Sequence, residues 1–296
     1  MSKYSNIKKA VIAAAGTGTR FLPATKNQPK EMLPIIDKPI IQYLVEEAVA
    51  SGITDIILVT RSGSHIIEDY FDTRADLEYS LEKNGKNDYL KIVKDIPQMA
   101  NFIYIRQKNN LPYGNGSPIL AAKNLIDKDE SFVYMFGDDL TLSDIPVSKQ
   151  LMDVYINQEA DAVLGVQEVP WDEVERYGTI KYKDNPNYKY EIEKACEKLP
   201  REKAYSNMCQ FGRFVFSYDV IETALRTKTG KDNELWVIDI LNQMAQEGKK
   251  IIAQPIKGEW LTTGDPLRYL KATLKFTMKR NDLEKDIREF IKNEIL

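Results

Sequence analysis

The sequence predicts an α/β fold in which helices flank a mixed, mostly parallel central sheet. Two observations support this prediction. Short apolar runs, typical of buried strands, alternate with segments whose apolar residues follow helical spacing, and this alternation indicates βαβ units. Glycine-containing or acidic turns follow several of the strand-like runs, as expected at the carboxyl edge of a parallel sheet, where ligands bind. Residues 1–296 are expected to form a single domain, because no repeat, linker or low-complexity segment divides them.

The first half of the chain carries the alternation most regularly. Strands are expected where β-branched and aromatic residues form short runs, at residues 10–13, 53–60, 102–106, 132–136 and 162–169. Pro39 and Gly52 are start and stop signals that bracket the first helix. Apolar spacing predicts further helices at 64–71, 118–126 and 149–158, and the polar segment 74–97 is expected to be a helix plus a loop.

The rhythm changes after Val169. Strand-like runs at 177–182, 188–193 and 208–217 are joined by shorter links, so antiparallel pairs are expected to join the sheet. Helices are expected at 220–226 and 235–246, followed by a last strand at 251–255. Two amphipathic, highly charged helices at 266–279 and 283–295 are expected to close the chain.

The composition excludes several classes of protein. Hydrophobic residues make up 43% of the chain and charged residues 29%, as is ordinary for globular proteins. The net charge of -3 provides no general basic field for nucleic acid. No apolar run approaches the length of a membrane span, and the first residues lack the apolar core of a signal peptide. We therefore expect no membrane partner and a cytoplasmic location.

Histidine and cysteine are scarce. His65 is the only histidine, which excludes zinc sites with several histidine ligands and leaves any Ser-His-Asp or Cys-His mechanism to this residue. It follows Ser64 at the start of a predicted helix, so we expect it on the surface. Cys196 and Cys209 lack C-x-x-C spacing and are expected to be reduced thiols. Catalysis must then rest on carboxylates, Lys, Arg and a metal ion.

A small-residue loop, Ala13-Ala-Ala-Gly-Thr-Gly-Thr-Arg20, follows the first strand. Small residues let backbone N–H groups approach an anion closely, and Arg20 and Lys30 add positive charge. Gly16 and Gly18 match only the first half of a dinucleotide fingerprint, and no lysine follows at P-loop spacing. The pattern favours a phosphate loop of a third kind. A tight turn with an exposed arginine is the alternative.

The turn Gly137-Asp138-Asp139 follows the apolar strand at 132–136. Mg²⁺ keeps most of its water ligands and takes one or two protein carboxylates together with substrate phosphates. The alternative is a turn with solvated aspartates, which are common in turns. The predicted sheet places this turn beside the phosphate loop, and that placement favours the metal site.

Two further polar sets follow strand-like runs. Gln107 and the glycine loop that begins at Gly114 could receive a pyrimidine base, because an amide offers both a donor and an acceptor. Gly178, Glu197 and Lys198 belong to a later set, in which a carboxylate could bind sugar hydroxyls and a lysine a phosphate. Exposed turns and ordinary surface charge pairs remain the alternatives for both sets.

The chain resembles a known family in several specific segments. Gly16-Thr-Gly-Thr-Arg-Phe-Leu-Pro-Ala-Thr-Lys26, Pro29-Lys-Glu-Met-Leu-Pro34 and the segment 41–52 closely resemble the bacterial UTP–glucose-1-phosphate uridylyltransferases, or UDP-glucose pyrophosphorylases. The resemblance continues through 105–108, 137–139, 197–198, 206–207, 212–213, 263–265 and 269–272, and therefore spans nearly the whole length.

The resemblance implies a Rossmann-like nucleotidyltransferase fold of the GT-A-like kind, dependence on Mg²⁺, and synthesis of UDP-glucose with release of pyrophosphate. It assigns the triphosphate to Arg20 and Lys30, the metal to Asp138, and the glucose phosphate group to Lys198. Substrate would also contact the following residues: Ala14, Ala15, Gly16, Gly18, Gln107 and Gly114 on the UTP side, and Gly178 and Glu197 on the sugar side. The family further implies a homodimer or homotetramer, with the helical segment 265–296 joining subunits.

Three segments depart from the family pattern. Gly114-Asn-Gly-Ser-Pro118 replaces the usual Gly-Leu-Gly-His-Ala loop, residues 234–239 read Glu-Leu-Trp-Val-Ile-Asp, and Thr262 stands where relatives place a carboxylate. These departures leave two alternatives open: the same chemistry with another sugar 1-phosphate or nucleotide, or a weakly active, regulatory paralogue. Because His65 lies outside every motif, we expect sequential transfer without a uridylyl-histidine.

Overall fold

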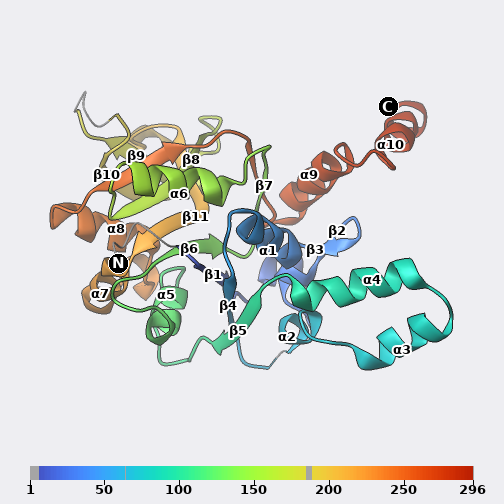
Figure 1. The fold of residues 1–296 in the computed structure, drawn as a ribbon. Helices are drawn as coiled ribbons and strands as arrows, with labels where there is room; N and C mark the ends of the chain where they lie inside the picture. The colour runs from blue at the N-terminus through green and yellow to red at the C-terminus, as the bar shows by residue number, and fades with distance from the viewer. Residues whose placement is uncertain (1–6, 64, 185–188, 296) are drawn as a thin grey trace.

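The structure is a computed structural model, and it describes residues 7–63, 65–184 and 189–295. Ser64 and Tyr188, each part of a predicted element, lie outside these ranges. The centre is a nine-stranded sheet in the order β10-β9-β11-β6-β1-β4-β5, with β8 paired to β11 and β12 paired to β8 (Figure 1). Its strands are β1 (Lys9–Ala14), β4 (Asp55–Thr60), β5 (Asn101–Arg106), β6 (Ser131–Phe136), β8 (Ala162–Glu168), β9 (Gly178–Tyr182), β10 (Ile192–Glu197), β11 (Met208–Ser217) and β12 (Ile251–Pro255).

The sheet has a parallel half and a mainly antiparallel half, in which β12 still pairs in parallel with β8. Antiparallel pairs therefore join the parallel strands, as predicted. β1 pairs in parallel with β4 and β6, and β4 pairs in parallel with β5. β11 runs antiparallel to β6, β8 and β9. The register sets Ala13 opposite Phe136, so the loop after β1 and the turn after β6 leave the sheet at the same edge.

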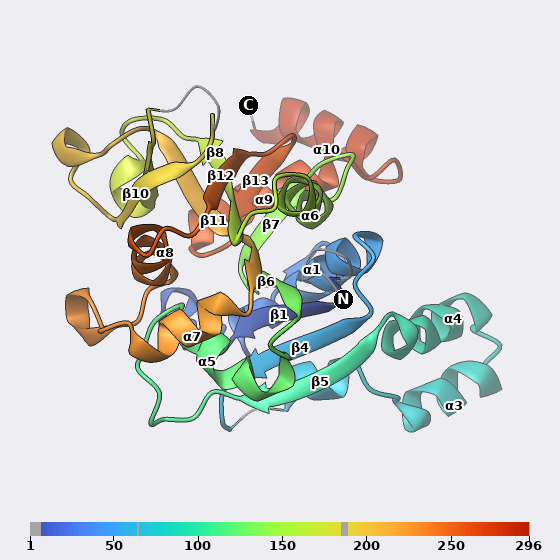
Figure 2. The ribbon, with the colours of Figure 1, turned by 60° about the vertical axis from the view of Figure 1, so that its left-hand side comes forward.

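Helices bury both faces of the sheet, which explains why its strands read as continuous apolar runs. Neighbouring residues of β1 enter opposite cores, with Ile12 in one cluster and Val11 in the other. The first core also takes residues from α1 (Ile40–Ala50) and α6 (Val147–Asn157). The second core takes residues from α5 (Ser117–Ala122), α7 (Asp219–Arg226) and α8 (Val237–Gln246), and Figure 2 shows these layers from a second side.

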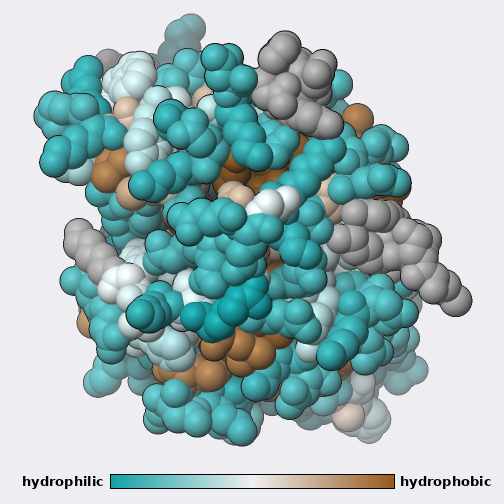
Figure 3. Space-filling model, turned by 90° about the vertical axis from the view of Figure 1, so that its left-hand side faces the viewer, coloured by the Kyte–Doolittle hydropathy of each residue, from teal (hydrophilic) through white to brown (hydrophobic). Residues whose placement is uncertain are grey.

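Four other helices lie at the periphery. α3 (Ala75–Lys83) and α4 (Asn87–Asp95) form a hairpin that projects beside β5, and neither helix contains a buried residue (Figures 1 and 2). α9 (Pro266–Thr277) and α10 (Glu284–Phe290) close the described chain, and a turn of π-helix continues α10 through Ile291–Ile295. Across the described ranges, no helix is both long enough and apolar enough to cross a bilayer. The face shown in Figure 3 is largely hydrophilic.

Several element predictions need correction. Residues 74–97 form two helices rather than one helix and a loop, because Gly85 adopts a left-handed φ of 64° that turns the chain between them. The helix predicted at 64–71 is the shorter α2 (Ile66–Tyr70), and His65 is its N-cap residue. β10 lies at Ile192–Glu197 and not at 188–193, and α5 ends at Ala122, where one 3₁₀ turn takes over.

The strand at 251–255 is not the last one. Two short strands, β7 (Asp139–Leu142) and β13 (Glu259–Thr262), pair outside the main sheet. A smaller hairpin joins β2 (Pro34–Ile35) to β3 (Lys38–Pro39). These strands have two to four residues, too few to show an alternating pattern in the sequence.

Candidate active site

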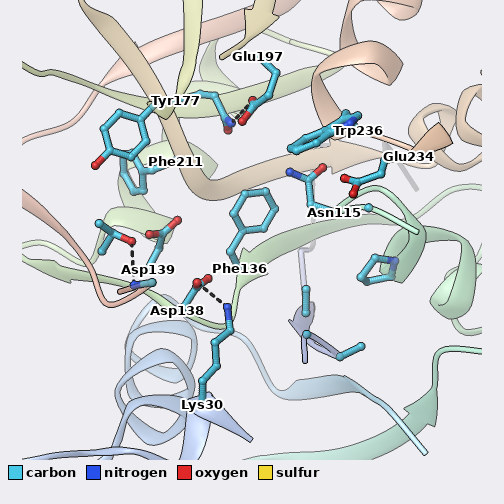
Figure 4. A pocket seen from close by; sticks show the side chains of 18 of the residues that line it. Lys30, Asn115, Phe136, Asp138, Asp139, Tyr177, Glu197, Phe211, Glu234 and Trp236 are labelled. Carbon is cyan, nitrogen blue, oxygen red and sulfur yellow. Dashed lines mark hydrogen bonds and ion pairs between the residues drawn. The ribbon is translucent and has the colours of Figure 1, made fainter. Parts of the chain in front are cut away.

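A cavity of about 320 Å³ lies where the carboxyl ends of β1 and β6 face the antiparallel half of the sheet (Figure 4). The residues that line it come from both halves of the chain. Among the residues predicted from the sequence, the lining includes Ala15, Gly16, Arg20, Lys30, Gln107, Gly114, Asp138, Glu197 and Lys198. Segments far apart in the sequence therefore meet in one place.

Three predicted residues lie outside this lining. Ala14 is buried at the end of β1, paired with Thr60 of β4. Gly18 lines an adjoining hollow of about 190 Å³, together with Arg20. Gly178 is buried in β9, where an added Cβ would lie 2.8 Å from the Glu197 Oε2 atom, so its small size leaves room for that carboxylate.

The phosphate loop and the aspartate turn are in direct contact. The Gly137 N–H donates to the Ala13 carbonyl oxygen at 3.0 Å. Lys30 Nζ lies 2.6 Å from Asp138 Oδ2, as Figure 4 shows, and Arg20 donates to the Gly264 carbonyl at 3.2 Å. The predicted meeting of the two turns across one cleft is confirmed.

The two aspartates have different surroundings. Asp139 is buried, and its carboxylate accepts hydrogen bonds from Trp260 Nε1 and the Gly212 N–H, both at 2.9 Å. Burial, followed by the neighbouring Asp138 charge, raises the pKa of Asp139. The backbone of Asp138 is held through its carbonyl, which accepts from the Thr263 N–H and hydroxyl at 2.7 and 2.8 Å. Asp139 therefore anchors the turn, and Asp138 presents its carboxylate to the cavity.

Lys30 lies between two carboxylates. Burial lowers the pKa of Lys30, but attraction to Asp138 and Glu31 outweighs burial and raises the pKa above its ordinary value. Glu31 is buried beneath the lysine, and burial raises the pKa of Glu31 to about 7. Its Oε2 atom has no hydrogen-bond partner among the described residues. The sequence does not mark Glu31 as a site residue, because nothing in the Pro-Lys-Glu-Met pattern tells a buried glutamate from an exposed one.

The loop at Gly114 is tied to the segment before α8. Gly114 has a φ of 118°, and an added Cβ would lie 2.4 Å from the Leu235 carbonyl oxygen, so only glycine fits. The Asn115 side chain accepts from the Val237 N–H at 2.8 Å. This contact places Glu234 and Trp236 on the cavity wall, although no sequence motif marks either of them as a site residue.

The opposite wall carries Glu197 and Lys198 at the end of β10. Gln210 donates weakly to Glu197 at 3.4 Å, and burial raises the pKa of Glu197 to about 7. Lys198 Nζ lies 4.5 Å from the centre of the Trp236 ring, within reach of a cation–π interaction. A buried carboxylate and a cation beside each other suit a ligand that carries both hydroxyls and an anionic group.

Aromatic side chains form much of the remaining wall. Phe211 stacks on Trp260 with 5.2 Å between ring centres, and Tyr177 meets Trp260 edge-on at 4.8 Å. Phe136 also lines the cavity. The sequence predicts Phe136 only as part of an apolar strand, and no motif marks Phe211 or Trp260 as a site residue.

The single histidine and the two cysteines are not among the residues that line this cavity. His65 is exposed and contacts Arg106 at 3.2 Å, which confirms its expected surface position. Cys196 and Cys209 are both free thiols, as predicted.

The donor set fits a magnesium ion that keeps most of its waters. No cluster of three or more His, Cys, Asp or Glu side chains forms a closed metal site within the described part of the chain. The Asp138 carboxylate and the hydroxyl of Thr262, which both line the cavity, match the open oxygen coordination that Mg²⁺ prefers when phosphates supply the other ligands.

Comparison with known proteins gives a consistent result. The Nucleotidyl transferase family model matches residues 9–279. UTP–glucose-1-phosphate uridylyltransferases from Staphylococcus epidermidis and Bacillus subtilis are 42% and 39% identical, over 97% and 96% of this chain and 98% and 96% of theirs. A UDP-glucose pyrophosphorylase solved with UDP-glucose is 38% identical, with a TM-score of 0.82 over 93% of this chain and 100% of that one. The UTP-bound enzyme from Acinetobacter baumannii is 32% identical, with a TM-score of 0.88 over 98% and 100%. The chain belongs to the nucleotidyl transferase family and, within it, to the UTP–glucose-1-phosphate uridylyltransferases.

Proposed function

We propose that the protein transfers UMP from UTP to glucose 1-phosphate, forming UDP-glucose and releasing pyrophosphate. One observation carries the proposal: the phosphate loop, the Asp138 turn and the Glu197–Lys198 pair line a single cavity. That cavity offers an anion loop and a metal carboxylate on one side, and a hydroxyl acceptor beside a cation on the other. This arrangement suits a nucleoside triphosphate and a sugar phosphate bound together.

Each predicted residue has a role in this proposal. Arg20 and Lys30 would hold the β- and γ-phosphates, and the backbone from Ala14 to Gly18 would approach the phosphates and base. Gln107 and Gly114 would form the uridine wall. Glu197 would accept hydrogen bonds from glucose hydroxyls, Gly178 would keep space for that carboxylate, and Lys198 would bind the sugar phosphate.

Asp138 would be the protein ligand of Mg²⁺. Bound there, the metal would neutralise charge on the phosphates of UTP. A phosphate oxygen of glucose 1-phosphate would attack the α-phosphorus in line, and the bond to the β-phosphate would break, with pyrophosphate leaving with the electron pair. The residues position the reactants and balance their charge, and no covalent enzyme intermediate is needed.

The test is a panel of nucleoside triphosphates against sugar 1-phosphates, scored by pyrophosphate release with Mg²⁺. UTP with glucose 1-phosphate should give the highest rate, and Asp138→Ala should lower that rate by roughly 10²–10³-fold. Faster turnover with another pair would replace the proposed substrates. Thermal stabilisation by UTP without turnover would instead support the regulatory alternative.

We also infer a homo-oligomer that works in the cytoplasm. The assembly is supported by an apolar stripe on α9, where Leu267, Leu270 and Leu274 are 59%, 58% and 48% exposed. A cytoplasmic location fits enzymes whose substrates are a nucleoside triphosphate and a sugar phosphate.

A further inference from the structure

The site already contains a cation where a metal would bind. Lys30 Nζ lies 2.6 Å from Asp138 Oδ2, and the two side chains are 20% and 21% exposed. A second carboxylate, Glu31, lies 3.9 Å from the same ammonium group. The ammonium therefore occupies a position against the one cavity-facing carboxylate assigned to the metal (Figure 4).

We propose that Lys30 is a placeholder cation, which neutralises Asp138 in the nucleotide-free protein and transfers to the triphosphate when Mg²⁺ and UTP bind. The inference rests on the proposed metal role of Asp138. It gives Lys30 a second role besides holding phosphate, because the lysine competes with the metal for one carboxylate oxygen.

Lys30 lies close enough to the phosphate loop to contact a phosphate bound there. A Cβ added to Gly16 would lie 3.5 Å from Lys30 Cε and 3.8 Å from its Nζ. The ammonium thus lies close to both Asp138 and Gly16 of the phosphate loop. A phosphate bound in that loop can accept the ammonium through rotation of the flexible lysine side chain, without movement of the backbone. Glu31 stays beside the lysine in either position.

Competition between Lys30 and the metal for Asp138 determines how tightly the metal binds before UTP arrives. Metal alone must displace the ammonium from Asp138 and leave it without that partner, so metal binds weakly to the nucleotide-free protein. UTP supplies the replacement partner, so metal and nucleotide strengthen each other's binding by the same factor. We infer that the two enter the site as a unit.

The test measures binding of Mn²⁺ alone to the nucleotide-free protein, by the electron paramagnetic resonance signal of free Mn²⁺. Lys30→Met should bind Mn²⁺ about fivefold to tenfold more tightly than the wild type, as expected for loss of a half-buried ion pair. Lys30→Gln, which keeps a polar side chain, should show the same direction. Thermal unfolding checks that both variants are folded.

Arg20→Met is the matched control. This variant also removes a positive charge from the cavity. The guanidinium that it removes donates to the Gly264 carbonyl and not to Asp138. Tightening by both lysine variants well beyond that of Arg20→Met supports the placeholder. Equal tightening by the lysine and arginine variants would show a general charge effect and overturn it, as would unchanged binding in the lysine variants.

Asp138→Asn separates this inference from the proposed function. If it abolishes Mn²⁺ binding while Lys30→Met changes nothing, the placeholder is wrong and the metal role of Asp138 stands. If Asp138→Asn binds Mn²⁺ as the wild type does, the metal role itself is wrong and the placeholder falls with it.

Discussion

Burial changes the pKa of the Glu197 side chain in the cavity wall. The carboxylate lies on the cavity wall beside Lys198, and its neighbour Gly178 leaves it just enough room. Burial raises the pKa of Glu197 to about 7, so the group changes charge close to neutral pH. In its proposed role as an acceptor of hydrogen bonds from sugar hydroxyls, Glu197 would work best when it is ionised.

Affinity for the sugar phosphate should therefore fall as the pH is lowered. Below pH 7 the Glu197 carboxyl takes up a proton and loses acceptor capacity, so the KM for glucose 1-phosphate should rise about tenfold from pH 8 to pH 6. Steady-state kinetics with varied glucose 1-phosphate at saturating UTP measures this change. Glu197→Gln should have a high KM at every pH. Any change of KM with pH that remains in Glu197→Gln reports ionisation of the substrate phosphate. If KM changes with pH as steeply in this variant as in the wild type, Glu197 is not the group responsible.

The elements that hold the site depend on a buried ion pair at its back. Arg213 in β11 is fully buried, and Glu47 in α1 accepts three hydrogen bonds from it at 2.9 to 3.1 Å. Glu47 also accepts from Ser148 in α6 and Thr141 in β7. Arg213 donates in turn to the carbonyl of Gly212, whose N–H holds the Asp139 carboxylate. The pair thus joins α1, α6, β7 and β11 behind the aspartate turn.

Removing the charge of one member of the Glu47–Arg213 pair should destabilise the fold. Glu47→Gln leaves the Arg213 guanidinium buried without a countercharge, and we expect a loss of about 3 to 5 kcal/mol in the free energy of unfolding. Urea unfolding measures it. The double variant Glu47→Leu with Arg213→Met removes both charges and should recover most of the loss. A loss under about 1 kcal/mol in the single variant would contradict this account of the pair.

The same pair predicts an acid dependence of stability. Burial raises the pKa of Glu47, but attraction to Arg213 and hydrogen bonds from Arg213, Ser148 and Thr141 outweigh burial and lower it below 4.5. The folded-state pKa is therefore below the unfolded one. The contribution to stability is present above pH 4.5 and is lost as the pH falls below that value. Urea unfolding from pH 6 to pH 3 should show a steeper fall for the wild type than for the double variant.

The sequence predicted long elements well and short ones poorly. β1, β4, β6 and β11 carry uninterrupted apolar runs, and their positions were predicted within a few residues. β7 and β13 were not predicted, because a strand of four residues is too short to show an alternating apolar pattern. These two strands nevertheless hold Asp139 and Trp260 in place. In the site, Arg20, Lys30 and Asp138 follow motifs in the sequence. Glu31, Trp236 and Trp260 reach the cavity through tertiary contacts, and no local pattern tells them from residues outside the site.

At the scale of the whole molecule, one face of α9 exposes an apolar stripe. Leu267, Leu270 and Leu274 follow the i, i+3, i+7 spacing of one helix face and remain exposed. The family resemblance independently implies contacts between subunits through residues 265–296. Both observations support the proposed homo-oligomer, in which this leucine stripe would form the contact between copies of the chain.

Disrupting the stripe should lower the mass of the assembly. Light scattering after size-exclusion chromatography should find the wild type as a dimer or tetramer and Leu270→Glu as a smaller species, because a buried charge opposes association. Leu225→Glu is the control, since Leu225 is 57% exposed on α7, outside the stripe. A monomeric wild type, or equal dissociation of both variants, would contradict the prediction.

The central claim is that the phosphate loop and the Asp138 turn hold UTP and Mg²⁺ between them. A crystal structure of the protein with UTP and Mg²⁺ tests it most directly. We predict the triphosphate between residues 14–20 and the Asp138 carboxylate, with the metal on Asp138 and the Lys30 ammonium on phosphate. A nucleotide bound elsewhere, or a metal held without Asp138, would contradict the account.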